Sequence, residues 1–381
     1  MPSRLRAPHR LVLALVALAV GGCSGAAPEP FRQDADATPR LLASLTVTVQ
    51  DIDTEALLIS AHALDTLTVW AAGTKGTVAR TTDGGRTWAS GVVPGADTLQ
   101  FRDVYAFSAD EALVLSIGPG EASRIYRTAD GGDAWELAFV NPEPDGFFDC
   151  LAFWDARHGF AFSDSVDGRF LYAETSDGGR SWALRDALPA ATEGEGGFAS
   201  SGTCAAAYGR TGWIATGNAA QPRILRTTDR GATWTSAPVP LDGGDAAGAT
   251  SVSFRGDQVG LAVGGSLTAR DLFGRTVARS ADGGQTWTLG DSLPFPGAAY
   301  GVAWLTTLPA QLATGDAVAV GPGGVGVTGD GGLTWGLLSE DEHWGLAVAP
   351  TGAETRPRVA WLVGPEGRIT RVDAPPLVQN R

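Results

Sequence analysis

Carboxylate side chains in the polar stretches of the chain could carry out acid–base chemistry. Asp149 stands at the start of an expected strand, Asp164 lies in the stretch SDSVDGR, and Glu195 lies in the long polar stretch 183–203. Two carboxyl groups about 5–5.5 Å apart support retaining hydrolysis of a glycosidic bond, and a spacing of about 6.5–9.5 Å supports inverting hydrolysis. Glu195 together with Asp149 or Asp164 is therefore the candidate pair for such a reaction.

The sequence lacks the common metal, nucleophile and dinucleotide patterns. His62, His158 and His343 have no ligand spacing with the cysteines, and there is no G-x-S-x-G nucleophile elbow. Residues 321–326, GPGGVG, fit G-x-G-x-x-G, but this fingerprint binds a pyrophosphate only where a helix follows. Here another strand-like segment follows, so we expect no cofactor and no metal.

The composition indicates many short strands and tight turns. The chain has 381 residues with 52 Gly, 12 Trp and 1 Met, and charged residues make up only 18%. A coiled coil or helical bundle would be rich in charged residues and Ala, and a disordered chain would not be 44% hydrophobic. The formal net charge of -14 disfavours binding to the phosphate backbone of nucleic acids.

One nine-residue pattern occurs six times along the chain. The copies are RTTDGGRTW at 80–88, RTADGGDAW at 127–135, ETSDGGRSW at 174–182, RTTDRGATW at 226–234, RSADGGQTW at 279–287 and VTGDGGLTW at 327–335. Their aspartates recur at intervals of 47 to 53 residues. A repeat of roughly this length is typical of the blades of a propeller.

The pattern resembles the Asp-box, or bacterial neuraminidase repeat, of sialidases and sortilin-type receptor domains. The Asp carboxylate can accept backbone N–H bonds across a hairpin turn, the glycines allow positive φ, and the Trp ring packs between sheets. We interpret the motif as structural, and the resemblance implies that it lies on the face away from the binding site. Its Asp and Trp residues are Asp83 and Trp88, Asp130 and Trp135, Asp177 and Trp182, Asp229 and Trp234, Asp282 and Trp287, and Asp330 and Trp335.

Each unit divides into four strand-like segments. FRDVYAF, ALVLSIG, SRIYRTA and AWELAFV in residues 101–140 show the short alternating or apolar patterns of strands. HWGLAV, VAWLVG and GRITRVD near the end indicate a degenerate seventh blade without the turn motif, and residues 41–50 supply its outer strand. We predict an all-β, seven-bladed β-propeller over 41–373, with four antiparallel strands per blade, six Asp-boxes and a tail at 374–381.

Longer segments, at 147–182, 193–204 and 317–332, are similar to the bacterial branch of the photosystem II assembly/stability factor-like family. This resemblance implies the seven-bladed fold and a propeller face that holds a partner polypeptide.

The first residues resemble an export signal. Three arginines precede an apolar run from Leu11 to Val20, which is too short for an ordinary spanning helix. Residues 20–23, VGGC, resemble a bacterial lipobox in which Cys23 receives the lipid; an ordinary cleaved secretory signal is the alternative. We predict a lipoprotein signal peptide at 1–22, followed by the lipidated Cys23 and a flexible tether that together span 23–40.

Two cysteines remain, Cys150 and Cys204, at equivalent places in consecutive repeats. An export compartment permits a disulfide between them, and two buried small hydrophobic residues are the alternative.

The resemblance implies that binding residues lie in the loops that enter the inner strands and in those that join the second and third strands. Asp103, Asp149 and His343 stand at or just before inner strands and are expected to point toward the channel mouth. The candidate binding residues are Asp149, Asp164, Asp167, Glu193, Glu195, Ser201, Arg270, Arg275 and His343.

The lipobox-like residues predict an exported, lipid-anchored protein, and the family resemblance implies a non-catalytic binding, assembly or scaffold factor for a polypeptide in the cell envelope. The acidic loops favour a basic or polar ligand. A carbohydrate-active enzyme of glycoside hydrolase type or a glycan-binding propeller is the alternative. A sialidase is disfavoured because the early Arg-Ile-Pro motif does not occur, and so is an NAD-type oxidoreductase.

Overall fold

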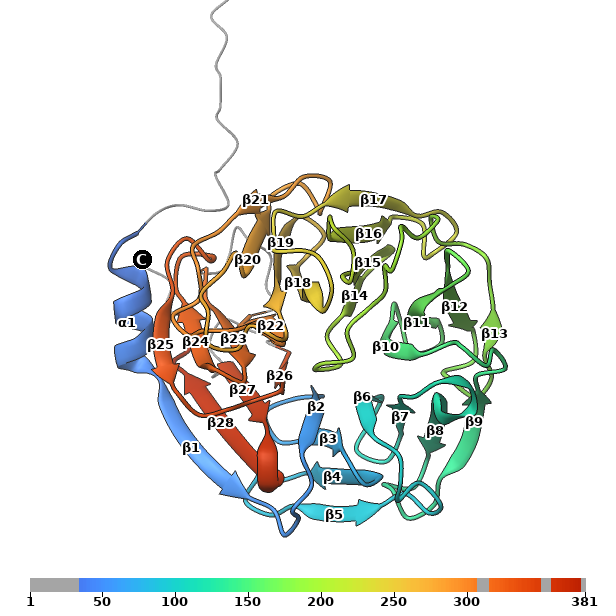
Figure 1. Cartoon of the computed structure of the whole chain (residues 1–381). Coiled ribbons are helices and arrows are strands. Elements are labelled where there is room, and N and C mark those ends of the chain that lie inside the picture. The colour runs from blue at the N-terminus through green and yellow to red at the C-terminus, as the bar shows by residue number, and fades with distance from the viewer. Residues whose placement is uncertain (1–33, 307–314, 351–357, 378–381) are drawn as a thin grey trace, which may run out of the picture.

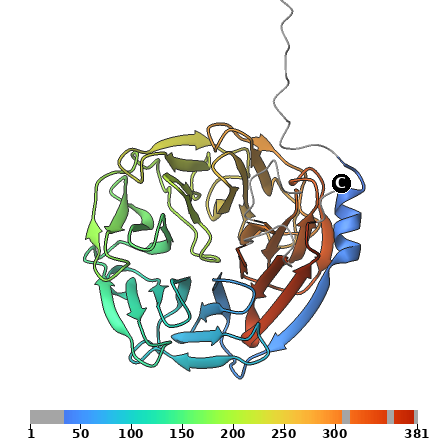
Figure 2. The same ribbon diagram turned by 180° about the vertical axis from the view of Figure 1, so that it is seen from behind.

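The computed structural model describes residues 34–306, 315–350 and 358–377. These residues form seven four-stranded antiparallel sheets that are arranged in a ring as the blades of a propeller (Figures 1 and 2). The predicted all-β, seven-bladed fold is therefore confirmed. The predicted signal peptide, Cys23 and most of the tether lie outside the described residues.

In each of the first six blades the chain runs from the innermost strand outward. Blades 1 to 3 are β2 (Leu58–Ala63), β3 (Val69–Gly73), β4 (Thr77–Thr81) and β5 (Ala89–Val92); β6 (Phe101–Ala106), β7 (Ala112–Ser116), β8 (Arg124–Thr128) and β9 (Glu136–Val140); and β10 (Phe148–Phe153), β11 (Gly159–Val166), β12 (Arg169–Thr175) and β13 (Ala183–Leu184). Blades 4 to 6 are β14 (Ala205–Tyr208), β15 (Thr211–Ala215), β16 (Arg223–Thr227) and β17 (Thr235–Pro238); β18 (Ala247–Arg255), β19 (Val259–Ser266), β20 (Val277–Ser280) and β21 (Thr288–Leu289); and β22 (Gly301–Trp304), β23 (Ala317–Gly321), β24 (Gly324–Thr328) and β25 (Gly336–Ser339).

The seventh blade combines both ends of the chain. It contains β26 (Gly345–Val348), β27 (Arg358–Val363), β28 (Arg368–Ala374) and, as its outer strand, β1 (Thr46–Asp51). Strand β1 pairs with β28 in register from Thr46 opposite Asp373 to Asp51 opposite Arg368. The N-terminal strand thus closes the ring, as expected, and covers the edge that β28 would otherwise expose.

The segment before this strand differs from the expectation. Residues 37–44 form helix α1 (Ala37–Ser44), which replaces the last residues of the expected tether and the first residues of the expected strand. Thr38, Leu41 and Leu42 lie on one helical face because they are three and four residues apart. Leu41 is buried, and the Thr38 hydroxyl lies 3.0 Å from that of Thr334 in blade 6. Packing of this face against blade 6 is the reason that the segment is ordered as a helix.

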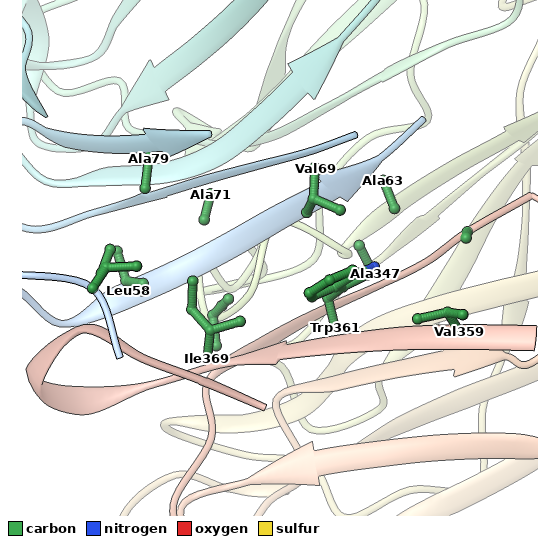
Figure 3. Close-up of a cluster of buried hydrophobic side chains, with 12 residues drawn as sticks. Leu58, Ala63, Val69, Ala71, Ala79, Ala347, Val359, Trp361 and Ile369 are labelled. Atoms are coloured by element: carbon green, nitrogen blue, oxygen red, sulfur yellow. The ribbon is translucent and has the colours of Figure 1, made fainter. Parts of the chain in front are cut away.

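Hydrophobic contacts fill the interface between blades 7 and 1 (Figure 3). Leu58, Val69 and Ala71 of blade 1 pack with Trp361 and Ile369 of blade 7 in one buried cluster. The Trp361 ring also meets the ring of Trp88 edge to face, with centroids 5.9 Å apart. Because large aromatic side chains bury the most apolar area, Trp361 is a main support of the closed ring.

The six DGG-type turns share one hydrogen-bond arrangement. In the first of them the Thr87 backbone N–H donates to Asp83 Oδ1 over 2.9 Å, and the Thr87 hydroxyl donates to Oδ2 over 2.6 Å. Gly85 N–H donates to the Thr81 hydroxyl, whose own proton goes to Asp83. These bonds, led by that of the Thr87 side chain, hold the pKa of Asp83 at about 2. The carboxylates of Asp130, Asp177, Asp229, Asp282 and Asp330 accept the corresponding backbone N–H in their own turns. The hydroxyl bond to Oδ2 recurs in all of these turns except that of Asp130, where Ala134 has no hydroxyl.

Removal of the Trp361 side chain should weaken the closed ring. Trp361→Ala should lower the free energy of unfolding by about 3–5 kcal/mol, because it leaves a cavity between blades 1 and 7. Leu337→Ala on the exposed outer strand β25 is the control and should change it by less than about 0.5 kcal/mol. Urea denaturation followed by tryptophan fluorescence measures both, and equal effects would contradict the importance of this interface.

Candidate functional site

The central channel contains a cavity of about 360 Å³. Inner strands of all seven blades contribute to its wall, mostly with residues from their carboxyl-terminal halves. Apolar residues such as Leu151, Val252 and Leu346 line it, together with the carboxyl group of Asp103 and the ring of His62. A volume of this size lies at the lower end of the range for small-ligand sites.

Residues 196–203 close the other end of the channel, and we call them the plug loop. They precede β14 and reach toward the centre of the ring (Figure 1). The guanidinium of Arg102 in blade 2 donates to the Ala199 carbonyl over 3.0 Å. The Ser201 hydroxyl donates to the Tyr300 carbonyl at the start of blade 6 over 2.6 Å. Gly202 and Thr203 line the cavity, so the plug loop forms its floor.

Asp149 and Asp164 lie directly beneath this loop rather than at an open mouth. Gly197 donates its backbone N–H to Asp164 Oδ1 over 2.8 Å. A Cβ atom on Gly196 would lie only 2.0 Å from Asp164 Oδ1, and one on Gly197 would lie 2.6 Å from Asp149 Oδ2. The two glycines are therefore required because the backbone crosses the carboxyl groups at contact distance.

This position changes the acidity of both groups. Burial raises the pKa of Asp149 well above its usual range, and the neighbouring Asp164 carboxyl raises it further. Burial likewise raises the pKa of Asp164 to about 6, although the Gly197 N–H opposes the shift.

Glu195 is an internal ion-pair partner, which corrects its assignment as a surface binding residue. Its side chain is fully buried and forms an ion pair with Arg223, whose Nε lies 2.9 Å from Oε1. Thr216 donates its hydroxyl to the same carboxylate, and Thr192 donates its backbone N–H. Burial alone would raise the pKa of Glu195, but the hydrogen bonds from Arg223 and Thr192 outweigh it and hold the pKa below its usual value. The group fixes the start of the plug loop.

His343 also points inward, contrary to expectation. Its ring is 1% exposed, with Nδ1 2.9 Å from the Asp341 carbonyl and Nε2 2.9 Å from the Thr370 hydroxyl. Burial lowers its pKa. Both ring nitrogens serve the packing of blade 7, so this residue is unavailable at the channel mouth.

The remaining candidates are dispersed over the loops. Asp167 occupies the tight turn between β11 and β12 with a φ of 51°, and Glu193 is exposed just before the plug loop. Arg275 is tied to Asp242 over 2.8 Å, while Arg270 is exposed. Ser201 lies in the plug loop and bonds across the channel to Tyr300 at the start of blade 6. The structure therefore does not gather the nine candidates into one site.

Two features of the loop face are not among the nine candidate binding residues, although the second lies in a polar loop that supplied Arg270 and Arg275. The Arg102 guanidinium stacks over the Trp344 ring at 5.3 Å, and the ring of Trp344 meets that of Tyr300 at 4.9 Å. Leu272 and Phe273 are 67% and 66% exposed on the loop between β19 and β20. Two adjacent large apolar residues in a polar loop were the signal for the second feature.

Cys150 at the start of blade 3 and Cys204 just before blade 4 form a disulfide, with their Cα atoms 6.0 Å apart. The bond fixes the end of the plug loop to β10.

Within residues 34–306, 315–350 and 358–377, no cluster of three or more metal-ligating side chains occurs. No helix in the described part of the chain is long and apolar enough to cross a membrane.

The fold defines the class of the protein as a seven-bladed β-propeller. Comparison of the sequence with protein-family models and with curated proteins gave no match. Among solved structures, it is similar to YCF48 bound to D1 peptide, with 15% identity, 85% of this chain and 94% of that chain covered, and a TM-score of 0.56.

Two further solved structures give similar values. YCF48 from Cyanidioschyzon merolae has 17% identity, 85% and 98% coverage, and a TM-score of 0.53. The Niastella koreensis GH74 enzyme has 14% identity and a TM-score of 0.53, with 83% of this chain but 43% of the enzyme covered. At these identities the likeness shows the fold.

The two kinds of buried carboxyl group should respond oppositely to substitution. Because the pKa of folded Asp164 is about 6 and its ordinary value is 3.8, its contribution to stability falls as the pH rises from about 4 to about 6. Asp164→Asn removes this loss. Its effect on the free energy of unfolding, relative to the unaltered protein, should therefore be about 1–3 kcal/mol more favourable at pH 7.5 than at pH 4.

Glu195→Gln is the matched comparison. It should destabilise the protein at pH 7.5 by about 3 kcal/mol, because Arg223 loses its buried partner. Urea denaturation at the two pH values measures both variants, and the same sign at pH 7.5 would refute the distinction.

Proposed function

We propose that this propeller binds a polypeptide partner on the loop face, where the plug loop closes the channel. The observation that carries the proposal is the exposed pair Leu272 and Phe273. Exposed adjacent apolar residues beside polar groups are typical of protein-binding surfaces, and aromatic side chains often dominate the binding energy. YCF48 bound to D1 peptide, which has a similar fold, supports a polypeptide as the kind of ligand.

The loop that carries the pair is held in place from below. Gly297 donates its backbone N–H to the Leu272 carbonyl over 2.8 Å, and Arg275 donates its backbone N–H to Asp242 over 2.9 Å. The backbone is therefore fixed while the two apolar side chains project into solvent. A fixed loop lowers the entropy cost of binding.

The expectation that acidic loops favour a basic ligand finds no support in the exposed residues of this face. Asp149 and Glu195, which suggested it, are each 1% exposed. Arg270 and Asp271 directly precede the apolar pair in the chain, and both are exposed with opposite charges. Apolar contact, rather than net charge, is therefore the recognition that this surface offers.

The burial of these acids also weakens the carbohydrate-active alternative. Neither Asp149, Asp164 nor Glu195 lines the central cavity. A glycosidase requires two carboxyl groups that reach the same glycosidic bond. The plug loop covers Asp149 and Asp164, and Glu195 is paired with Arg223. These three carboxyl groups are therefore better suited to holding the loop than to cleaving a glycosidic bond.

The partner contact can be tested with a photoreactive residue. In the native cell, p-benzoylphenylalanine in place of Phe273 should crosslink a defined envelope polypeptide, and the same residue in place of Leu337 on β25 should not. Leu272→Ser combined with Phe273→Ser should reduce co-purification of that polypeptide at least tenfold. Equal crosslinking from both positions, or undiminished co-purification, would exclude this surface.

Attachment to a membrane through Cys23 is part of the proposal and rests on the lipobox-like residues 20–23. Cys23→Ser should move the protein from the membrane fraction to the soluble fraction of lysed cells, because the lipid would be missing. Immunoblotting of both fractions measures the change, with Cys150→Ser as the control that keeps the anchor. A Cys23→Ser protein that stays in the membrane fraction would rule out this anchor.

A further inference from the structure

The cavity in the channel combines apolar walls with a single acidic group. Ala61, Leu151, Val302 and Leu346 line it from four different blades. Asp103 on β6 is the only carboxylic acid among the described residues that line it. Apolar side chains on the wall and one carboxyl group at the end are complementary to an aliphatic chain that ends in a cation.

The carboxyl group of Asp103 lies at the closed end of the cavity, against the plug loop. A Cβ atom on Gly202 would lie 2.6 Å from Asp103 Oδ1 and 3.0 Å from Ser60 Cβ, so the three residues are in contact. Asp103 is 4% exposed, and the hydroxyl of Ser60, which is 1% exposed, has no hydrogen-bond partner among the described residues. The closed end therefore retains unused hydrogen-bonding capacity.

Asp103 has no cationic partner within residues 34–306, 315–350 and 358–377. The backbone N–H of Leu151 donates a hydrogen bond to Asp103 Oδ2 over 2.8 Å. Burial raises the pKa of this carboxyl well above its usual range. A buried carboxylate without a counter-ion is costly, and a cationic ligand would remove that cost.

The ring-bearing residues His62, Tyr105 and Phe153 also line the cavity. The ring of His62 stacks on that of Tyr105 with centroids 4.4 Å apart, and Phe153 lies 4.6 Å from Tyr105 on the other side. The His62 Nδ1 atom accepts the Ala106 N–H over 2.7 Å, and burial lowers the pKa of His62 to about 4. At neutral pH the imidazole is therefore uncharged and does not repel a cation.

We propose that this cavity binds a primary alkylammonium group. The aliphatic chain lies along the apolar walls, and the ammonium donates hydrogen bonds to Asp103. The ligand reaches the cavity from the carboxyl-terminal ends of the inner strands, because the plug loop blocks the other end. A lysine side chain of a polypeptide and a free small amine share this chemistry.

A primary ammonium fits this site better than a guanidinium. A guanidinium binds a carboxylate with two parallel N–H bonds and needs both oxygens. The Leu151 N–H already occupies Asp103 Oδ2, which favours a compact cation that makes a single contact. The site is separate from Leu272 and Phe273, so it does not depend on the proposed partner surface.

Calorimetric titration of the purified full chain tests the proposal with n-butylammonium chloride, 1-butanol and n-butylguanidinium chloride. The ammonium should bind at least tenfold more tightly than the alcohol and more tightly than the guanidinium. Asp103→Asn should abolish the preference for ammonium over alcohol, because the amide keeps the acceptor for Leu151 but not the charge. Glu136→Gln, which changes an exposed acid on the outer strand β9, is the control and should leave the preference unchanged.

A second variant covers the case in which Asp103→Asn fails to fold. Ala303→Leu fills part of the cavity from β22 and should weaken butylammonium binding at least tenfold. Equal affinity for ammonium and alcohol in the unaltered protein, tighter binding of the guanidinium, or unchanged binding by Ala303→Leu would each overturn the proposal.

The source of the ammonium is distinguished with the peptide acetyl-Ala-Ala-Lys-Ala-Ala-amide and its norleucine counterpart. Binding of the lysine peptide, at least tenfold tighter than that of the norleucine peptide, would indicate a polypeptide lysine. Binding of butylammonium alone would indicate a free amine. Both outcomes support the site, whereas binding of neither cation overturns it.

Discussion

The pairing of β1 with β28 is the interaction on which the rest of the propeller depends. Each blade buries its faces against two neighbours, and seven separate hydrophobic clusters fill the spaces between adjacent blades. The interface between blades 7 and 1 joins segments that are far apart in the chain, so it forms at a high cost in chain entropy. The backbone pairs from Thr46 to Asp51 and the contacts of Trp361 offset that cost together.

The plug loop is the second organising feature, because it turns an open channel into a cavity with one closed end. It belongs to blade 4 but takes hydrogen bonds from Arg102 in blade 2 and provides one to Tyr300 in blade 6. Glu195 with Arg223 fixes its start, and the disulfide from Cys204 to Cys150 fixes its end. The carboxyl groups of Asp164 and Glu195, which were expected on an open acidic surface, instead hold the plug loop in place.

The loop thereby separates two surfaces with different chemistry. Exposed apolar side chains at 272–273 lie on the plugged face, where a polypeptide could be held without access to the channel. The cavity beyond the plug loop has Asp103 at its closed end and the stacked rings of His62 and Tyr105 in its wall. One face thus offers apolar contact, and the channel offers a buried carboxyl group.

The sequence by itself determined the repeat, the strand pattern and the closure of the ring by an N-terminal strand. These properties follow from local patterns: the turn motif at Asp83 and its repeats, the short strands, and an unpaired apolar segment before blade 1. It could not determine which way polar side chains face, since Asp149, Glu195 and His343 look like loop residues until their neighbours are known. Only the tertiary structure brought residues 196–203 across the channel and placed Arg223 beside Glu195 and Thr370 beside His343. The physical reason is that burial and pairing depend on contacts between distant blades, and no local pattern encodes those contacts.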